Sequence, residues 1–199
     1  MIISSPVEVN DEAEIINSLF EEGMQMFHIR KPGAVISEVD MFIKKIKPAF
    51  YNKLVLHQHH VIAGNYGIKR LHFKEEAREK LEARDYSLLR TSGYSLSTSI
   101  HSMQAYHNLS PFFEYAFLGP VFNSISKPGY KGAWADCILP ENKKGPKIVA
   151  IGGIDETNME KAMDMKFDGV AILGAIWQRP EEGVKQFKLL QEVWKVSGP

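Results

Sequence analysis

The most informative segment of the chain is Lys147-Ile148-Val149-Ala150-Ile151-Gly152-Gly153, an apolar run that ends in two glycines. It lacks polar alternation, which is typical of a strand covered on both faces. A second such run, Gly169-Val170-Ala171-Ile172-Leu173, leads into Gly174-Ala175, and helical spacing over 155–165 lies between the two. A strand, a helix and a strand in this order predict parallel pairing.

The same alternation extends over the whole chain. We predict strands at 1–3, 25–29, 54–56, 70–73, 94–97, 114–118, 147–151 and 169–173, and helices at 11–20, 35–46, 75–83, 101–108, 155–165 and 181–196. Eight such strands favour an α/β fold, a (β/α)₈ TIM barrel with parallel strands; an open doubly wound sheet is the alternative. No linker divides the chain, so we expect a single TIM-barrel domain over 1–199. The long segment 123–146 has no predicted element and is expected to be functional or mobile.

Composition excludes several classes of protein. The 199 residues carry 24 Lys plus Arg and 24 Asp plus Glu, and zero net charge argues against a general nucleic-acid partner. The single Cys137 fits a reducing compartment. The start of the chain lacks the basic region of a signal peptide, and the apolar runs reach only about eight residues, too few to span a membrane. We therefore expect a cytoplasmic protein without a membrane partner.

Basic, hydroxyl and glycine residues follow the predicted strands, and carboxylates are scarce among them. Since active sites of parallel barrels lie at the C-terminal ends of the strands, this composition predicts an anionic, phosphorylated ligand. The glycines after the last two strands favour close approach of backbone N–H groups to phosphate. The candidate binding residues are Arg30, Lys31, Ser124, Ser126, Lys127, Gly152, Gly153, Gly174 and Ala175.

Several histidines lie at or near the same strand ends. His101 directly follows a strand beside Ser102, which makes it a candidate general acid–base group or a helix cap. His57 and His59 alternate, so they could share a face, with His72 as a third metal ligand. No Cys or carboxylate stands at a ligand spacing, so we expect no metal there. The candidate residues of the mouth are His28, His57, Gln58 and His72.

In order along nearly the whole chain, these strand-end residues resemble the thiamine phosphate synthase/TenI superfamily of compact (β/α)₈ barrels. The segments that carry the resemblance are His28-Ile29-Arg30, Ser99-Ile100-His101-Ser102, Leu118-Gly119-Pro120-Val121-Phe122 through Lys127, Val149 through Ile154, and Asp168-Gly169-Val170-Ala171.

The resemblance implies two activities. Synthases join a hydroxymethylpyrimidine pyrophosphate to a thiazole phosphate with the help of Mg²⁺ and release pyrophosphate; TenI-type proteins bind the thiazole phosphate and tautomerise its carboxylated form. It also implies that Gly152, Gly153, Gly174 and Ala175 bind the thiazole phosphate. The pyrophosphate-facing loop of the synthases would correspond to Ser124, Ser126 and Lys127, and their arginine to Arg30.

The departures from the synthase pattern favour the TenI-like branch. The segment Arg30-Lys31-Pro32 replaces Arg-Glu-Lys, and His57-Gln58 stands where synthases carry Asn-Asp, so a Mg²⁺ ligand is lost; Glu76 at best replaces a second one. His101 matches the catalytic histidine of TenI-type proteins. We therefore expect a thiazole tautomerase, an isomerase of thiamine biosynthesis that needs no cofactor. The alternatives are a divergent synthase, a transferase using Mg²⁺, and a non-catalytic thiazole or thiamine phosphate binder. The oligomeric state stays open, a homo-oligomer included.

Overall fold

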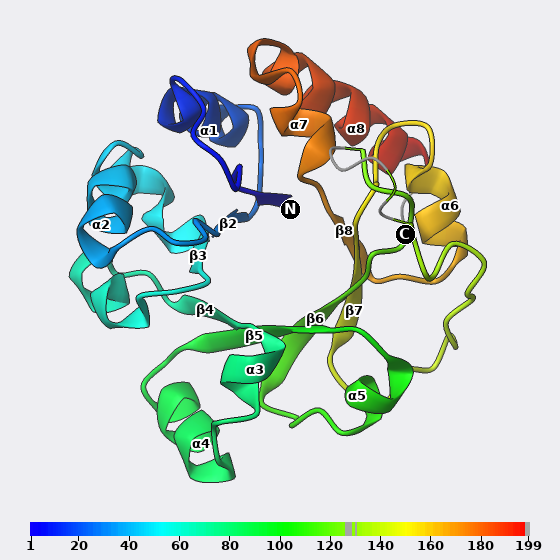
Figure 1. Cartoon of the computed structure of the whole chain (residues 1–199), viewed down its shortest axis with the longest axis horizontal. Coiled ribbons are helices and arrows are strands. Elements are labelled where there is room, and N and C mark those ends of the chain that lie inside the picture. Colours follow the sequence, from blue (N-terminus) through cyan, green and yellow to red (C-terminus); the bar gives the residue numbers. More distant parts are fainter. Residues whose placement is uncertain (126–128, 130, 198–199) are drawn as a thin grey trace.

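The computed structural model describes residues 1–125, 129 and 131–197. Eight strands pair in sequence order round a ring, every neighbouring pair parallel, with helices on the outside (Figure 1). The strands are β1 (Ile2–Ile3), β2 (Phe27–Ile29), β3 (Leu54–Leu56), β4 (Arg70–Phe73), β5 (Ser95–Ile100), β6 (Phe113–Leu118), β7 (Lys147–Ile151) and β8 (Gly169–Ala171).

The first and last strands meet. The N–H of Ile3 donates to the carbonyl oxygen of Ile172 at 2.9 Å, and the N–H of Ile172 donates to that of Met1 at 3.0 Å. A parallel bridge between Ile2 and Ile172 completes this junction, which we call the seam. The predicted (β/α)₈ barrel is confirmed, since an open doubly wound sheet would leave its edge strands unpaired.

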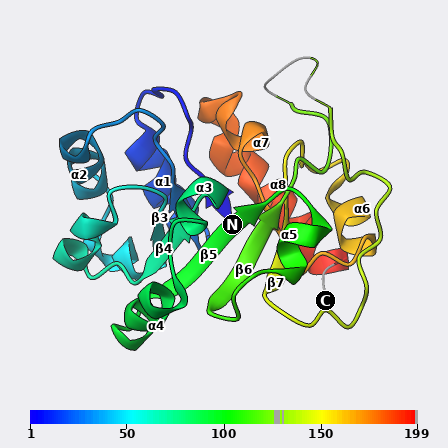
Figure 2. The ribbon, with the colours of Figure 1, turned by 60° about the horizontal axis from the view of Figure 1, so that its bottom comes forward.

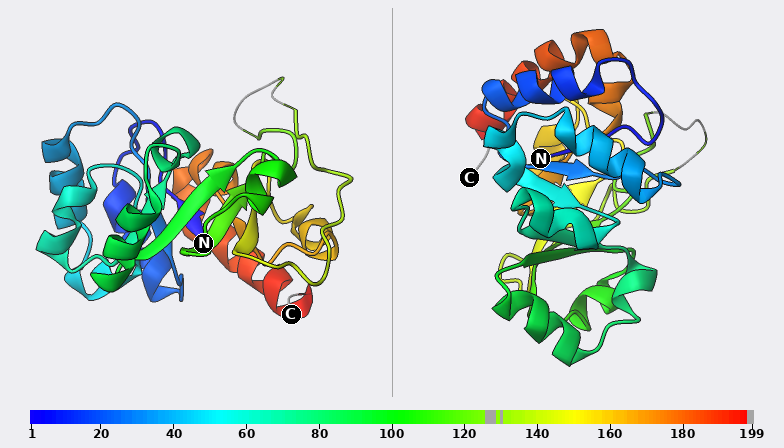
Figure 3. Two further views of the ribbon diagram at one scale, coloured as in Figure 1. Left: turned by 90° about the horizontal axis from the view of Figure 1, so that it is seen from below. Right: turned by 90° about the vertical axis from the view of Figure 1, so that its left-hand side faces the viewer.

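The helices separate the strands and cover the outside of the barrel. The first helix, Glu12–Glu21, and the last, Gly183–Ser197, lie side by side (Figure 3, right). The α-helices are α1 (Glu12–Glu21), α2 (Ile36–Lys44), α3 (Glu75–Arg78), α4 (Ala83–Thr91), α5 (Met103–His107), α6 (Met159–Asp164), α7 (Gly174–Trp177) and α8 (Gly183–Ser197), and the 3₁₀ turns are η1 (Pro48–Lys53), η2 (His60–Tyr66) and η3 (Pro180–Glu182). None of the helices described is long and apolar enough to cross a membrane.

Two helix predictions need correction. The helix predicted over 75–83 ends at Arg78, and a second helix, α4, begins at Ala83 and continues beyond the prediction. The Asp85 side chain accepts the Glu82 N–H at 2.8 Å at the start of α4, and the Tyr86 hydroxyl donates to the Arg78 carbonyl at the end of α3. The helix predicted from 155 begins only at Met159, because Asp155 accepts the N–H and hydroxyl of Thr157 in a local turn.

Strand side chains alternate between two cores. The outer core holds residues such as Phe27, Leu54 and Leu71, packed with the helices. The inner core fills the barrel lumen and includes Tyr115 and Phe117. Between β6 and β7, the described part of 119–146 contains neither helix nor strand, as predicted for 123–146 (Figure 2).

Candidate active site at the barrel mouth

The loops after β6, β7 and β8 converge at the C-terminal ends of the strands. Gly152 and Gly153 have φ values of +99° and +67°, and a Cβ on Gly153 would lie 2.1 Å from the Asn123 carbonyl oxygen. A Cβ on Gly174 would lie 3.2 Å from the Ile125 Cβ. The turn at Gly152–Gly153 therefore needs glycine, and at Gly174 a side chain would crowd Ile125, because the loop after β6 lies against both segments.

This close approach brings part of the predicted phosphate site together. Ser124 lies between Asn123 and Ile125, in the segment that contacts both turns. Ala175 lines a small cavity of about 120 Å³ with Ile125 and Arg179. Ser126 and Lys127, predicted for the same site, lie outside the described residues.

His101 lies beside the end of β6, next to the glycine turn. Its Nδ1 is 3.1 Å from the carbonyl oxygen of Gly119, and Gly119 packs so closely against Ile151 that a Cβ would lie 2.2 Å from its carbonyl oxygen. The cap of α5 is Ser102, whose hydroxyl accepts the Ala105 N–H at 3.1 Å. The imidazole is thus exposed and anchored by a backbone carbonyl, and it does not cap the helix.

The two predicted cations after β2 have different surroundings. No described residue pairs with the Arg30 guanidinium, which is half-buried near His57 and His72. Lys31 instead forms an ion pair with Glu12 and lies 4.7 Å from the centre of the Phe42 ring. Arg30 remains available to an anion, whereas the charge of Lys31 is neutralised within the protein.

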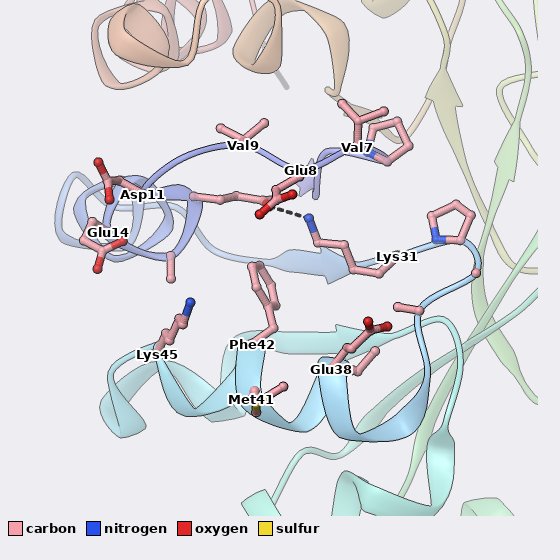
Figure 4. Close-up of a pocket in the computed structure, with 17 residues that line it drawn as sticks. Val7, Glu8, Val9, Asp11, Glu14, Lys31, Glu38, Met41, Phe42 and Lys45 are labelled. Carbon is pink, nitrogen blue, oxygen red and sulfur yellow. Dashed lines mark hydrogen bonds and ion pairs between the residues drawn. The ribbon is translucent and has the colours of Figure 1, made fainter.

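A carboxylate that was not predicted for the site, Glu12, lies beside the loop after β2. Glu12 is only 5% exposed, and burial raises the pKa of its carboxyl more than the Lys31 ammonium lowers it. It lines a cavity of about 730 Å³ between α1 and α2, into which Lys31 extends from the loop after β2 (Figure 4). Glu12 begins the helix after β1, and its place after a strand end is the signal that could have found it.

Gln58 connects two strand ends. Its side-chain amide donates to the Lys31 carbonyl, and its oxygen accepts the Lys31 N–H at 3.4 Å. Gln58 therefore ties the loop after β3 to the loop after β2.

Three histidines meet inside the lumen. His28, His57 and His72 come from β2, the residue after β3, and β4, and they are 0%, 7% and 0% exposed. The expectation that His57 and His59 share a face was wrong: β3 ends at Leu56, and His59 turns away with a φ of +54° to place its Nε2 2.7 Å from the Ala34 carbonyl oxygen.

Burial lowers the pKa of all three histidines in the lumen, to about 3 for His72 and well below 6.5 for His28 and His57. The inward position of His28 on a predicted strand was the signal that could have linked it to the others.

The residues at the mouth do not fit the Mg²⁺ site that the resemblance implies for synthases. Mg²⁺ prefers carboxylate oxygens, and Gln58 carries no charge. Within the described part of the chain, the one convergent group of three or more His, Cys, Asp or Glu side chains is the histidine cluster.

Fold and strand-end geometry together define a class: TIM barrels whose site lies at the mouth, where glycine turns follow the last two strands. The chain belongs to the thiamine monophosphate synthase family (TMP-TENI), whose profile matches residues 1–176.

Two curated relatives carry the name thiamine-phosphate synthase. That of Leuconostoc citreum (strain KM20) is 25% identical over 186 residues, which is 86% of this chain and 85% of the relative. That of Anoxybacillus flavithermus (strain DSM 21510 / WK1) is 31% identical over 102 residues, covering 49% of this chain and 46% of the relative, so that match spans under half of the relative's length.

Among solved structures, a thiamine phosphate pyrophosphorylase from Pyrococcus furiosus superposes with a TM-score of 0.79 at 16% identity, over 100% of this chain and 96% of that one. At this level of identity the likeness concerns the fold.

Proposed function

We propose that the protein binds a thiazole phosphate at the barrel mouth and tautomerises its carboxylated form, with His101 as general acid–base. The observation that carries the proposal is the setting of His101: exposed at the mouth, fixed by Gly119 and adjacent to the glycine turn after β7. Proton transfer between ring positions needs such a group and a phosphate anchor, and no metal.

The hydrogen bond of His101 suggests how the proton moves. When Nδ1–H donates to the Gly119 carbonyl, the neutral ring keeps its lone pair on Nε2. Nε2 removes a proton from one position of the bound heterocycle, becomes N–H, and returns that proton at the second position. The substrate gains and loses no electrons, and the histidine ends in its starting state.

The phosphate of the substrate would lie against the turns at Gly152–Gly153 and Gly174, with the predicted Ser124, Ser126 and Lys127 beside it. Arg30 supplies a cation without an internal partner among the described residues. Lys31, held by Glu12, would act by keeping the loop after β2 in place.

The test follows interconversion of the carboxythiazole phosphate tautomers by NMR with purified protein. We expect acceleration over buffer that falls at least about 100-fold in His101→Asn. His107→Asn, a change at an exposed histidine on the next helix, is the matched control and should keep full activity. Absence of acceleration by the wild type, or full activity in His101→Asn, would refute the proposal, and binding without turnover would support the non-catalytic binder.

The synthase is the second candidate because the curated relatives carry that name. It predicts thiamine phosphate and pyrophosphate from hydroxymethylpyrimidine pyrophosphate and thiazole phosphate. The reaction would depend on added Mg²⁺, which the substrate's own phosphates would have to hold in place of protein carboxylates. A product formed at equal rates with Mg²⁺ and with chelator would count against this candidate.

A further inference from the structure

A cluster of three histidines lies in the lumen against apolar side chains of the inner core. The Phe117 ring is 4.8 Å from that of His28 and 4.9 Å from that of His72, between centroids. One ring nitrogen from each of His28, His57 and His72 lies within 4.8 Å of the other two. The rings of His57 and His72 stack at 4.0 Å between centroids, and that of His28 lies edge-on to both.

We propose that His28, His57 and His72 form a binding site for a divalent transition-metal ion, zinc being the first choice. Three imidazoles suit zinc and its neighbours in the first row, and sites with three protein ligands keep a fourth position open. That position would face the mouth on the side of His57, the one partly exposed member of the trio. The inference does not depend on the proposed function, since it uses neither His101 nor the glycine turns.

The hydrogen bonds around the cluster already orient two of the ligands. The Tyr115 hydroxyl donates to the Met26 sulfur at 3.2 Å, so it can accept the Nε2–H of His28, 3.0 Å away; this leaves the lone pair of His28 on Nδ1.

The same logic applies to His72. The Ser97 hydroxyl donates to the Leu71 carbonyl at 3.4 Å, so it can accept from Nδ1 of His72 at 3.0 Å, which leaves the lone pair on Nε2. In the metal-free protein the Ser99 hydroxyl, 2.9 Å away, donates to this Nε2, and a bound metal ion would take the place of that proton. Metal-bound histidines usually donate their second N–H to a fixed acceptor in this way.

The nitrogens of the cluster lie near the spacing that a tetrahedral ion requires, with the closest pair too near and the others within 4.8 Å. His28 Nδ1 and His57 Nε2 are 2.9 Å apart. Two nitrogens at about 2.0–2.1 Å from a tetrahedral zinc ion are about 3.3 Å apart, so this pair would separate by roughly 0.4 Å. Burial keeps the three imidazoles neutral at neutral pH, so protons do not compete with the metal.

The ligand chemistry and the charge of the site determine which metal ion it binds and what occupies the fourth position. Among the residues that the structure describes, it offers nitrogen and hydroxyl groups but no carboxylate, so Mg²⁺ and Ca²⁺ find none there of the ligands they prefer. A buried dication among neutral ligands, with Arg30 nearby, calls for an anion in the fourth position. That anion would be hydroxide or an anionic group of a molecule bound at the mouth.

The test titrates zinc, in competition with a chromophoric chelator, into untagged full-length protein freed of metal. We expect one zinc ion per chain, without competition from millimolar Mg²⁺. Binding should weaken at least about 100-fold in His57→Asn. It should stay unchanged in His59→Asn, the matched control two residues away whose ring contacts the Ala34 carbonyl.

A second measurement uses the wild type alone, in case the lumen variant does not fold, as judged by circular dichroism. Co²⁺ should give the intense visible absorption of a four- or five-coordinate site, and X-ray absorption of the zinc form should show imidazole nitrogens at about 2.0–2.1 Å. No stoichiometric binding, equal affinity in the folded His57→Asn, or an octahedral cobalt spectrum would overturn the proposal.

Discussion

At the scale of single residues, the glycine turn after β7 shows how backbone conformation and packing require the same residue. Gly153 combines a φ of +67° with close contact to the loop after β6. We expect Gly153→Ala to lose more than about 2 kcal/mol of unfolding free energy, because left-handed strain of about 1–2 kcal/mol adds to the clash with Asn123. Urea unfolding measures this loss of free energy, and phosphate affinity measures the effect of the substitution on the proposed site.

A matched glycine separates the clash from the strain. Gly67 has a φ of +65°, and a Cβ there would meet nothing within 4 Å. Gly67→Ala should therefore lose only about 1–2 kcal/mol and keep phosphate affinity. Equal losses in the two variants would contradict the role assigned to the β6 loop.

How much of the site the sequence predicts depends on how local each residue's environment is. Gly152, Gly174 and His101 follow predicted strands, so barrel geometry predicts their position at the C-terminal ends of β7, β8 and β5, where the structure has them. The partner of Lys31 was not predictable, because Glu12 reaches it from another helix, 19 positions away in sequence. Likewise, the meeting of His28 with His57 depends on which side chains point into the lumen.

At the scale of elements, the ion pair between Lys31 and Glu12 joins the loop after β2 to the first turn of α1. The two side chains are 15% and 5% exposed. Lys31→Met should therefore reduce unfolding free energy by about 3–5 kcal/mol, since it leaves the buried Glu12 carboxylate without its cation and only with the hydrogen bond that it accepts from the Ser5 N–H. Adding Glu12→Gln should restore most of the loss, measured by chemical denaturation.

An exposed pair provides the comparison. Lys47 and Glu21 are 57% and 54% exposed, so Lys47→Met should cost at most about 1 kcal/mol. Similar costs for the two lysine variants would show that burial does not decide the strength of the Lys31 pair.

The buried histidine cluster, which connects three neighbouring strands, makes the stability of the fold depend on pH. In the unfolded chain each histidine gains a proton as pH falls through about 6.5, whereas burial keeps the folded rings neutral, that of His72 down to a pKa of about 3. Since the unfolded state binds more protons, metal-free protein should lose about 1.4 kcal/mol per pH unit per neutral histidine below pH 6.5.

Urea unfolding in chelator between about pH 7.5 and pH 5 measures this slope. His57→Asn should reduce this slope by the contribution of one histidine, about 1.4 kcal/mol per pH unit. His107→Gln, at an exposed site, should leave the slope unchanged. Stability that stays flat or rises below pH 6.5 would show that the cluster is not neutral in the fold.

At the scale of the whole molecule, we expect the seam to be the least stable junction between strands, because β1 is short. β1 has two residues, whereas β5 and β6 have six each. The seam also depends on the Trp177 indole N–H, which donates to the Ile3 carbonyl at 2.6 Å. We expect the amides of Ile3 and Ile172 to exchange with solvent at a lower opening free energy than those between β5 and β6.

Native-state hydrogen exchange in wild type and Trp177→Phe tests this expectation. The variant should speed exchange at the seam and leave β5 and β6 unchanged. Uniform protection round the barrel would refute it.

The sequence predicted that eight strands exist, but β1 was predicted one residue too long and β8 two, because apolar runs do not reveal where ladder hydrogen bonds stop.

The seam also has a consequence for biosynthesis on the ribosome. Seven of the eight strand junctions join segments that are neighbours in the chain, so each can form soon after its second strand emerges. The eighth joins Ile2 to Ile172, which are 172 − 2 = 170 positions apart. Until β8 is synthesised, β1 presents an unpaired edge, and the growing sheet is most open to wrong pairing during that interval.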